Sequence, residues 1–402
     1  MGDEPINLPV SVIGGCGHVG LPLAVVSASL GRPTSIYDID EGAIASVGAG
    51  RAPFLEHGLD DLLPKVLRDG TLTLSSDPKV LAEARHVVLV VGTPVDRYLN
   101  PELDALFGAL EPCLPHLRDG QTLILRSTVY PGTSRKIQDW LDERGLRVDV
   151  AFCPERIAQG FAIPEIRELP QIISAFSESG LEAAREFFEP IAPSLVSLEP
   201  LEAELAKLFT NAYRYIEFAT VNQFYMIAEA QGADYHRIER AIKHDYPRLA
   251  HLPGPGFTAG PCLLKDTMQL AAFYNHNFSL GHAALWINEG LPDFIVGQLK
   301  AEHRLRDKTV AILGMAFKAE SDDTRDSLSY KLFKLLRLEA KRTLCHDPYV
   351  RDPGLVPLDR AVSEADILIV ATPHREYRDL RVPADKVVVD IWNCLPQAAR
   401  PE

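Results

Sequence analysis

The sequence lacks the features that mark several broad classes of protein. Its 41 Lys and Arg residues stand against 55 Asp and Glu residues, a formal net charge of −14, so it has no general basic excess for binding nucleic acid or anionic membranes. No apolar run approaches the ~20 residues that span a bilayer, and the first residues do not form a secretion signal. These absences predict a cytoplasmic protein with no nucleic-acid or membrane partner.

Cysteine is also sparse. The chain has no CxxC pair and no Cys/His spacing typical of zinc ligands, and its six cysteines are dispersed at positions 16, 113, 153, 262, 345 and 394. We therefore predict free thiols and no metal. With 402 residues, 46% of them hydrophobic, the chain is long enough for two to four domains with large cores.

The N-terminal segment carries a dinucleotide-binding pattern. An apolar strand candidate, Val10–Ile13, runs into Gly15-Cys16-Gly17-His18-Val19-Gly20 and then a helical stretch. In such a loop the first glycine makes the turn, the second lets the backbone approach a pyrophosphate, and the third lets the helix pack closely.

A carboxylate follows at the expected distance. The next strand candidate, 34–37, ends at Asp38, near the spacing of about 20 residues for a side chain that binds the adenosine ribose. Asp38 would repel a 2′-phosphate and no arginine directly follows it, so the pattern favours NAD over NADP. The alternative for Asp38 is a turn carboxylate at a strand end.

Three further strand candidates, 86–91, 122–125 and 148–152, are followed by polar residues. Continuous apolar runs of this kind are typical of buried parallel strands, whose carboxyl ends bind ligands in open α/β sheets. Thr93, Thr128 and Glu155 follow these ends. Glu155 is a candidate acid or base, and its alternative role is a surface pair with Arg156.

From about residue 201 the pattern becomes helical. Lys207 and Asn211 are four residues apart, which places them one turn apart on one helix face, where an ammonium and an amide could hold one polar ligand. A solvated helix face is the alternative interpretation.

A lone cysteine then lies in a loop rich in glycine and proline, residues 253–262. Cys262 is followed by Lys265 and Asp266, and a nearby cation favours the reactive thiolate. The sequence thus suggests a catalytic thiol, with a buried structural cysteine as the alternative.

The C-terminal part resembles a second nucleotide-binding fold. A charged segment, 300–308, is predicted to be a linker, and strand candidates follow at 309–314, 343–346, 366–371 and 387–390. Because no GxGxxG is present, we expect no second dinucleotide here. Lys318 and Arg325 suit a phosphate-bearing ligand, and ordinary surface charge is the alternative.

Taken together, these motifs resemble the UDP-glucose/GDP-mannose dehydrogenase family over nearly the whole chain. The matching segments are GCGHVGLPLA, GTP at Thr93, STVYPGT at Thr128, CPER at Glu155, EAELAKLFTNAYR at Lys207, PGPGFTAGPCLLKD at Cys262 and GMAFKAESDDTRDS at Lys318. The resemblance implies an α/β fold with an N-terminal Rossmann NAD domain (1–197), a central helical dimerisation domain (198–300) and a C-terminal Rossmann-like sugar-nucleotide domain (301–402).

The family resemblance also implies an activity, a four-electron oxidation of a sugar C6 alcohol to a carboxylate with two NAD, through a cysteine thiohemiacetal and thioester. The implied catalytic residues are Cys262, Lys207, Asn211, Asp266, Glu155 and Thr128. The implied cofactor-binding residues are Gly15, Gly17, His18, Val19, Gly20, Asp38, Thr93, Thr128 and Arg325. The implied substrate-binding residues are Glu155, Lys207, Asn211, Phe257, Phe317, Lys318 and Arg248, the last reaching the sugar from the other subunit of a homodimer.

The substrate stays open at this point. UDP-glucose or a close analogue such as dTDP-glucose is our first expectation, and UDP-N-acetylmannosamine or UDP-N-acetylglucosamine is the alternative. A single-step β-hydroxyacid dehydrogenase or a non-catalytic NAD-binding protein would fit less well, because Cys262 lies in its motif. Two departures from the family pattern are the glycine-poor loop before Cys262 and Gln159, where some members carry a second glutamate.

Overall fold

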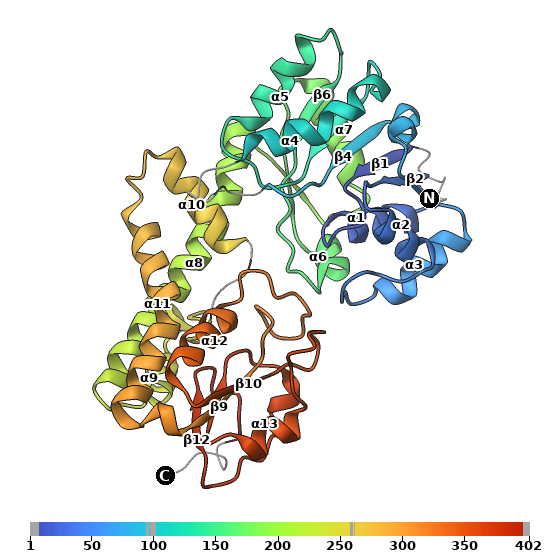
Figure 1. Ribbon diagram of the computed structural model, residues 1–402. Helices are drawn as coiled ribbons and strands as arrows, with labels where there is room; N and C mark the ends of the chain where they lie inside the picture. Colours follow the sequence, from blue (N-terminus) through green and yellow to red (C-terminus); the bar gives the residue numbers. More distant parts are fainter. Residues whose placement is uncertain (1–7, 94–95, 97–101, 258–259, 261, 397–402) are drawn as a thin grey trace. The chain divides into compact units, whose positions relative to one another are not determined.

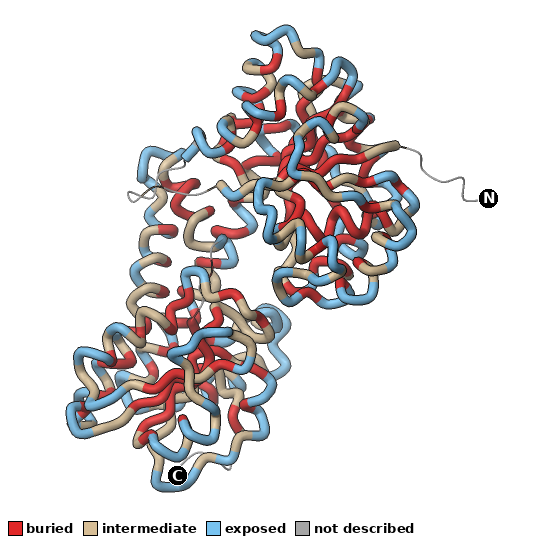
Figure 2. Tube along the Cα trace, turned by 45° about the vertical axis from the view of Figure 1, so that its right-hand side comes forward, coloured by how far each residue is buried: buried red, intermediate tan, exposed pale blue. Residues whose placement is uncertain are grey.

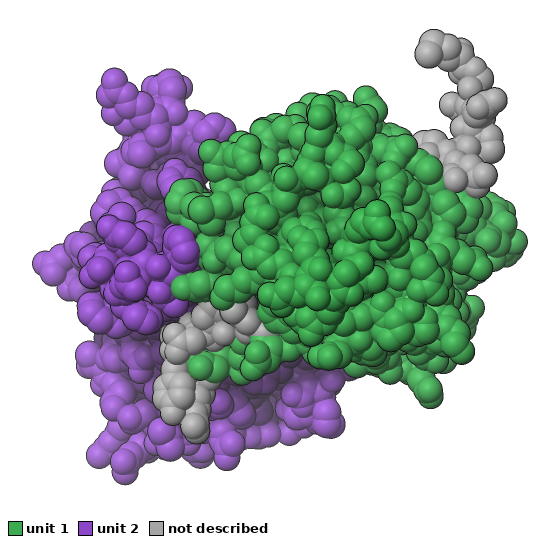
Figure 3. Space-filling view, turned by 90° about the horizontal axis from the view of Figure 1, so that it is seen from above, with its two compact units in different colours: residues 1–210 green, residues 211–402 purple. Residues whose placement is uncertain are grey.

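The chain divides into two compact units, residues 1–210 (unit 1) and 211–402 (unit 2) (Figure 3). The computed structural model describes residues 8–93, 96, 102–257, 260 and 262–396. Figure 1 shows their helices and strands. No helix within these ranges is both long and apolar enough to cross a membrane.

Unit 1 is built on a six-stranded parallel sheet of order β3-β2-β1-β4-β5-β6. This is the strand order of a dinucleotide-binding Rossmann fold, as the sequence predicts. Its strands are β1 (Val10–Ile13), β2 (Thr34–Tyr37), β3 (Leu72–Ser75), β4 (His86–Leu89), β5 (Thr122–Leu125) and β6 (Asp149–Phe152). The order reverses between β1 and β4, which places the ligand-binding edge at the ends of these strands.

Helices and short elements complete unit 1. The helices are α1 (Gly20–Ser29), α2 (Glu41–Gly48), α3 (Leu59–Arg68), α4 (Leu103–Leu110), α5 (Thr133–Asp142), α6 (Ala162–Glu168) and α7 (Glu178–Phe188). Short 3-10 helices are η1 (Pro78–Glu83) and η2 (Glu111–His116), and a small parallel pair joins β7 (Gln171–Ile173) to β8 (Leu195–Ser197).

The sheet of unit 1 is buried on both faces, as its apolar runs require. Every residue of β1, β4 and β5 is buried, and two apolar clusters pack against the sheet. Figure 2 shows the buried trace running through the strands. Burial at about 25 cal/mol per Å² of apolar surface makes this core the main stabilising contribution to the unit.

Unit 2 combines long helices with a second parallel sheet. The helix α8 (Pro200–Ala230) begins in unit 1 and continues into unit 2, where α9 (Tyr235–Lys243), η3 (Pro247–Leu249), α10 (Leu263–Phe273) and α11 (Ser279–Glu302) follow. The sheet has the order β10-β9-β11-β12. Its elements are β9 (Thr309–Leu313), α12 (Leu328–Glu339), β10 (Arg342–His346), α13 (Leu358–Glu364), β11 (Ile367–Val370), η5 (Arg375–Tyr377) and β12 (Val387–Asp390).

The predicted linker 300–308 is largely regular structure instead. The helix α11 continues to Glu302, and η4 (Leu305–Asp307) leads into β9. The charges misled the prediction because Lys300 pairs with Glu339 of α12 at 2.6 Å, while Leu305 is buried in the core. The ion pair of Lys300 and the buried side chain of Leu305 therefore fix this segment to the rest of unit 2.

Candidate active site

The glycine loop of unit 1 passes close to the sheet. Gly14 has φ +73°, and a Cβ there would lie 2.1 Å from the carbonyl oxygen of Val90. At Gly20, the first residue of α1, a Cβ would lie 2.8 Å from the carbonyl oxygen of Gly14. Only glycine fits these positions. The N-cap residue of α1, Val19, makes no side-chain cap, and a helix N-terminus of this kind can receive a pyrophosphate.

Asp38 lies directly after β2 and braces this loop. One carboxylate oxygen accepts the N–H of Cys16 at 2.9 Å, and the other accepts the N–H of Asp40 at 3.1 Å. Burial, with a smaller effect of Asp38, raises the pKa of the Cys16 thiol to about 12, so this loop cysteine stays a neutral thiol. Through these hydrogen bonds the half-buried carboxylate holds the loop at the end of the strand, which is where a ribose would bind.

His18 in the same loop contacts Gln159. The amide nitrogen of Gln159 lies 3.0 Å from Nδ1 of His18, and the imidazole packs on Phe54 with ring centroids 4.0 Å apart. The departure at Gln159 therefore ties the glycine loop to the segment after β6, a contact that sequence reasoning did not anticipate.

The ends of β4 and β5 are joined by side chains. The hydroxyl of Thr93 donates to the carbonyl oxygen of Thr128 at 2.6 Å. The hydroxyl of Ser127 donates to Val91 O at 2.6 Å and accepts from Val91 N at 3.0 Å. Thr93 and Thr128, predicted separately, thus lie together at the carboxyl edge of the sheet.

Glu155 is nearly buried, with 9% of its surface exposed, and forms an ion pair with Arg126. Its other oxygen accepts the backbone N–H groups of Arg156 and Ile157 at 2.7 and 3.0 Å. The expected alternative, a surface pair with the Arg156 side chain, is therefore wrong. Arg126, which also donates to Gln171, was missed, although it directly follows β5.

Glu204 is a second residue that the sequence reasoning missed. Its buried carboxylate accepts the N–H of Gly132 at 2.6 Å and the N–H and hydroxyl of Ser134 at 2.8 and 2.5 Å. It thereby caps the N-terminus of α5 from α8. Burial raises the pKa of Glu204 despite these hydrogen bonds. Half-buried Lys207 lies one turn further along α8.

In unit 2, Cys262 is exposed and is the N-cap residue of α10. A buried structural cysteine, the alternative raised by the sequence, is therefore excluded. Asp266 in the first turn of α10 is completely buried, and its carboxylate accepts the amide N–H of Asn211 at 2.5 Å. Its second oxygen lies 3.5 Å from Nζ of Lys265. A thiol, a carboxylate, an amide and an ammonium thus gather at the start of one helix.

The chain before Cys262 is held from several sides. Asn222 of α8 donates to Gly256 O at 3.0 Å and accepts from Gly256 N at 2.8 Å. A Cβ on Gly256 would lie 2.4 Å from Trp392, and one on Gly260 would lie 2.5 Å from Phe317. The departure from the family pattern in this loop lies partly outside the described residues, at positions 258, 259 and 261.

The remaining residues that were predicted to bind a ligand differ in how far they are buried and in what they contact. Phe317 and Lys318 are half-buried on the loop after β9, and Arg325 binds Asp323, whose hydrogen bond raises the pKa of the guanidinium. Arg248 is exposed beside Tyr246, whereas the Phe257 side chain is 3% exposed and belongs to the core of unit 2.

A group of possible metal ligands also lies in unit 2. Ligand atoms of Glu320, His374 and Glu376 lie within 4.8 Å of one another. However, Nδ1 of His374 faces the N–H of Glu320, and Nε2 lies 3.1 Å from Asp347. We assign this group to a polar network in which the histidine is already engaged.

The predicted residues fall into two sets. The glycine loop, Asp38, Thr93, Thr128, Glu155 and Lys207 belong to unit 1, whereas Asn211, Arg248, Phe257, Cys262, Asp266, Phe317, Lys318 and Arg325 belong to unit 2. Unit 1 carries the features of a dinucleotide site, and unit 2 carries the exposed Cys262 thiol.

Three family domains match this arrangement. The NAD-binding, central and UDP-binding domains of UDP-glucose/GDP-mannose dehydrogenases match residues 9–192, 201–289 and 311–397, in that order. The chain belongs to this family. Its cofactor is NAD, which fits the closely packed glycines of the loop and the half-buried Asp38 of unit 1.

The relatives carry different substrate names. Two UDP-N-acetyl-D-mannosamine dehydrogenases, from Pyrococcus horikoshii and Methanocaldococcus jannaschii, are each 32% identical to this chain and align with 95% of it, covering 95% and 91% of their own lengths. A solved UDP-glucose dehydrogenase from Pyrobaculum islandicum is 26% identical, with a TM-score of 0.91 and coverage of 99% of this chain and 97% of its own. Within this nucleotide-sugar dehydrogenase family, the sequence relatives favour the N-acetylated alternative over our first expectation.

Proposed function

We propose that this dehydrogenase oxidises the C6 alcohol of a UDP-N-acetylhexosamine, in the first place UDP-N-acetylmannosamine, to the carboxylate. The names of its sequence relatives support this sugar. The observation that carries the reaction type is the exposed Cys262 thiol at the start of α10, beside Lys265 and the buried pair of Asp266 and Asn211. A one-step alcohol oxidation has no use for such a nucleophile.

The chemistry requires two oxidations. NAD bound to unit 1 would supply the hydride acceptor for each. After the first, the Cys262 sulfur adds to the C6 aldehyde and gives a thiohemiacetal. Loss of the second hydride and of the hydroxyl proton gives a thioester, and water then cleaves the C–S bond, which releases the carboxylate and returns the thiol. In total, one alcohol, one water and two NAD⁺ are converted to one carboxylate, two NADH and three protons.

The charged and polar side chains have distinct tasks in this scheme. The ammonium of Lys207 and the amide of Asn211 stabilise negative charge on the C6 oxygen, as oxyanion donors do. Asp266 fixes the Asn211 amide through their 2.5 Å hydrogen bond and receives a proton. Glu155 and Thr128 order the water that hydrolyses the thioester, with Arg126 holding the Glu155 carboxylate in place.

A substrate panel tests the choice of sugar. We expect kcat/KM for UDP-N-acetylmannosamine or UDP-N-acetylglucosamine to exceed that for UDP-glucose, dTDP-glucose and GDP-mannose by at least about tenfold, since one well-placed acetamide contact contributes about 1.4 kcal/mol. NADH formation measured with each purified sugar nucleotide at subsaturating concentration gives these ratios. A preference for UDP-glucose would return the protein to our first expectation.

We also propose a homodimer formed through α8. Four exposed apolar side chains, Phe209, Tyr213, Phe224 and Ile227, recur at helical spacing along it, with between 47% and 63% of each exposed. Exposed apolar side chains that recur on one helix face in this way mark a protein interface. A dimer would also allow the exposed Arg248 to act in the partner's site.

A single charge on this surface tests the dimer. We expect Phe224→Glu to convert a dimer to a monomer of 44.4 kDa, because an interface core does not accept an unpaired carboxylate. The control is Leu338→Glu on α12, where the apolar side chain that is replaced is 80% exposed. Light scattering after size exclusion measures both masses, and a monomeric wild type or a dimeric Phe224→Glu protein would contradict the proposal.

A further inference from the structure

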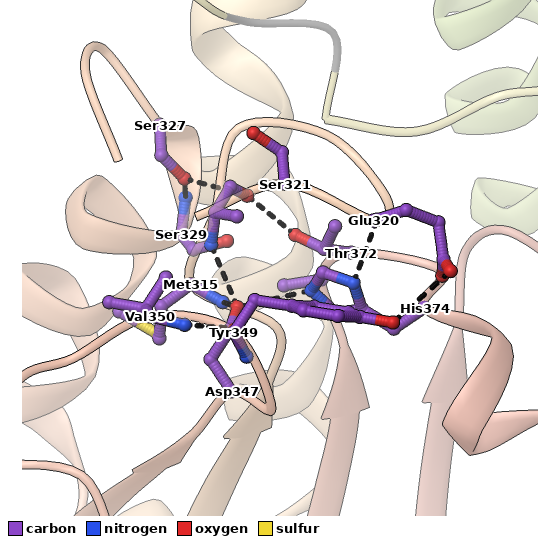
Figure 4. A network of polar contacts seen from close by, with 12 residues as sticks. Met315, Glu320, Ser321, Ser327, Ser329, Asp347, Tyr349, Val350, Thr372 and His374 are labelled. Atoms are coloured by element: carbon purple, nitrogen blue, oxygen red, sulfur yellow. Dashed lines mark hydrogen bonds and ion pairs between the residues drawn. The ribbon is translucent and has the colours of Figure 1, made fainter. Parts of the chain in front are cut away.

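Two buried side chains lie beneath the loop that carries Phe317 and Lys318. Asp347 directly follows β10, and His374 precedes η5, and neither side chain has any exposed surface. Nε2 of His374 lies 3.1 Å from Oδ2 of Asp347, and Nδ1 accepts the N–H of Glu320 at 3.1 Å. The acceptor role of Nδ1 places the ring proton on Nε2, which donates to Asp347. Figure 4 shows the two side chains within their network.

Asp347 organises the start of this loop. Its Oδ2 accepts the N–H groups of Met315 and Ala316 at 2.6 and 2.9 Å. Its Oδ1 accepts those of Tyr349 and Val350 at 2.8 and 3.0 Å. Burial alone would raise the pKa of this carboxyl, but the hydrogen bond and the electrostatic interaction with His374, together with the backbone hydrogen bonds, outweigh burial and bring the pKa down to about 2. The carboxylate therefore stays ionised with both oxygens engaged.

The other contacts fix the loop on both sides of Phe317 and Lys318. The hydroxyl of Thr372 donates to Ala316 O at 2.7 Å, before the two residues. After them, Glu320 donates its N–H to His374 and its carboxylate accepts from Arg375 at 2.6 Å. Loop 314–320 is thus held at both ends, while the Phe317 and Lys318 side chains remain half-buried at its centre.

In unit 1, the residue equivalent to Asp347 is Asp38, and its carboxylate is more exposed. Asp38 follows β2, which pairs with β1, as Asp347 follows β10, which pairs with β9. Asp38 accepts one N–H of its glycine loop and is half-buried. The Asp347 side chain is fully buried and is contacted by loop 314–320, by the residues that follow it and by His374. The carboxylate that would face a ribose in a dinucleotide fold is therefore unavailable in unit 2.

We propose that Asp347 and His374 are positioning residues for the sugar nucleotide, which preset loop 314–320 so that Lys318 meets the diphosphate in the bound geometry. The inference rests on the proposed function and on the family resemblance, which implies that Phe317 and Lys318 bind the substrate within the UDP-binding domain. A loop that is ordered before binding avoids the entropy cost of ordering it in the complex. The pair touches no reacting atom, so its effect falls on affinity for the nucleotide.

Binding of UDP and of NAD to the full chain, each measured by calorimetry, separates this role from general stability. Asp347→Asn places an amide N–H against backbone N–H donors, and we expect it to weaken UDP binding about tenfold or more. His374→Asn keeps an acceptor near Nδ1, and His374→Gln keeps a donor near Nε2. Each retains one of the two contacts, so we expect each to weaken UDP binding less than Asp347→Asn does. NAD affinity, which belongs to unit 1, should be unchanged in all three.

His346→Gln is the matched control. This histidine immediately precedes Asp347, but its Nδ1 faces Val356 O at 2.9 Å. We expect its UDP and NAD affinities to match the wild type. In turnover, the three test variants should raise KM for the sugar nucleotide with KM for NAD unchanged.

The outcomes separate this inference from the proposed function. Folded variants that bind UDP within twofold of the wild type would overturn the positioning role alone. A wild type that binds NAD but not UDP would overturn the proposed function and this inference together. If Asp347→Asn does not fold, the two His374 variants decide the matter, since each keeps half of the contacts.

Discussion

Replacing Cys262 with alanine is expected to lower kcat for NADH formation by a factor on the order of 10⁴ to 10⁶, comparable to the loss of other covalent nucleophiles. Cys262 is the exposed thiol at the start of α10, and the second oxidation requires its covalent adduct. Without the cysteine thiol, the aldehyde cannot form the thiohemiacetal whose carbon gives up the second hydride. Intact-protein mass spectrometry of the wild type during turnover should show the sugar-nucleotide adduct, which the variant lacks.

Cys394→Ala is the control for thiol chemistry. Its thiol is partly buried, and burial together with Asp390 raises its pKa to about 12, so it is a poor nucleophile at neutral pH. We expect this variant to retain wild-type kcat. A Cys262→Ala protein that kept more than a tenth of wild-type activity would rule out the covalent route and favour a single-hydride dehydrogenase.

Replacing Lys207 with alanine is expected to reduce kcat by about 100- to 1000-fold, the usual loss for one oxyanion donor. Lys207 is half-buried on α8, one turn from Asn211, and Glu204 fixes its helix against the N-terminus of α5. Alanine suits a helix interior, so the fold should persist. Because the charge on oxygen develops in the transition state, kcat should fall far more than KM rises.

The matched control is Lys136→Ala, which removes an exposed lysine from α5 in the same unit. Steady-state kinetics with both substrates varied separate kcat from KM for each variant. A loss below fivefold for Lys207→Ala would mean that the ammonium points away from the reacting oxygen and that α8 presents a solvated face.

Much of the fold can be predicted from the sequence, because buried parallel strands are continuous apolar runs. The segments at β1, β4 and β5 were predicted within two residues, since every side chain in them faces the core. By contrast, β3 was missed because this edge strand buries only Leu72 and exposes Thr73, so it is no continuous apolar run. The three-residue strands β7 and β8 give too short a pattern to recognise.

The sequence points to candidate site residues where the chemistry follows from a residue type and its place in a motif. Gly20, Asp38 and Cys262 are of this kind. Arg126, Glu204 and Asp347 were missed because each is a charged residue whose burial depends on a distant partner. In the sequence Glu204 looks like one more acid on an amphipathic helix, and only the packing of α8 on the start of α5 gives it a capping role.

The number of NADH molecules formed per sugar nucleotide consumed tests the central claim most directly. With UDP-N-acetylmannosamine at limiting concentration and NAD in excess, wild-type enzyme should form two NADH per sugar and a product that carries one new carboxylate. A final ratio of one, with an aldehyde or ketone as product, would contradict the two-step oxidation through Cys262.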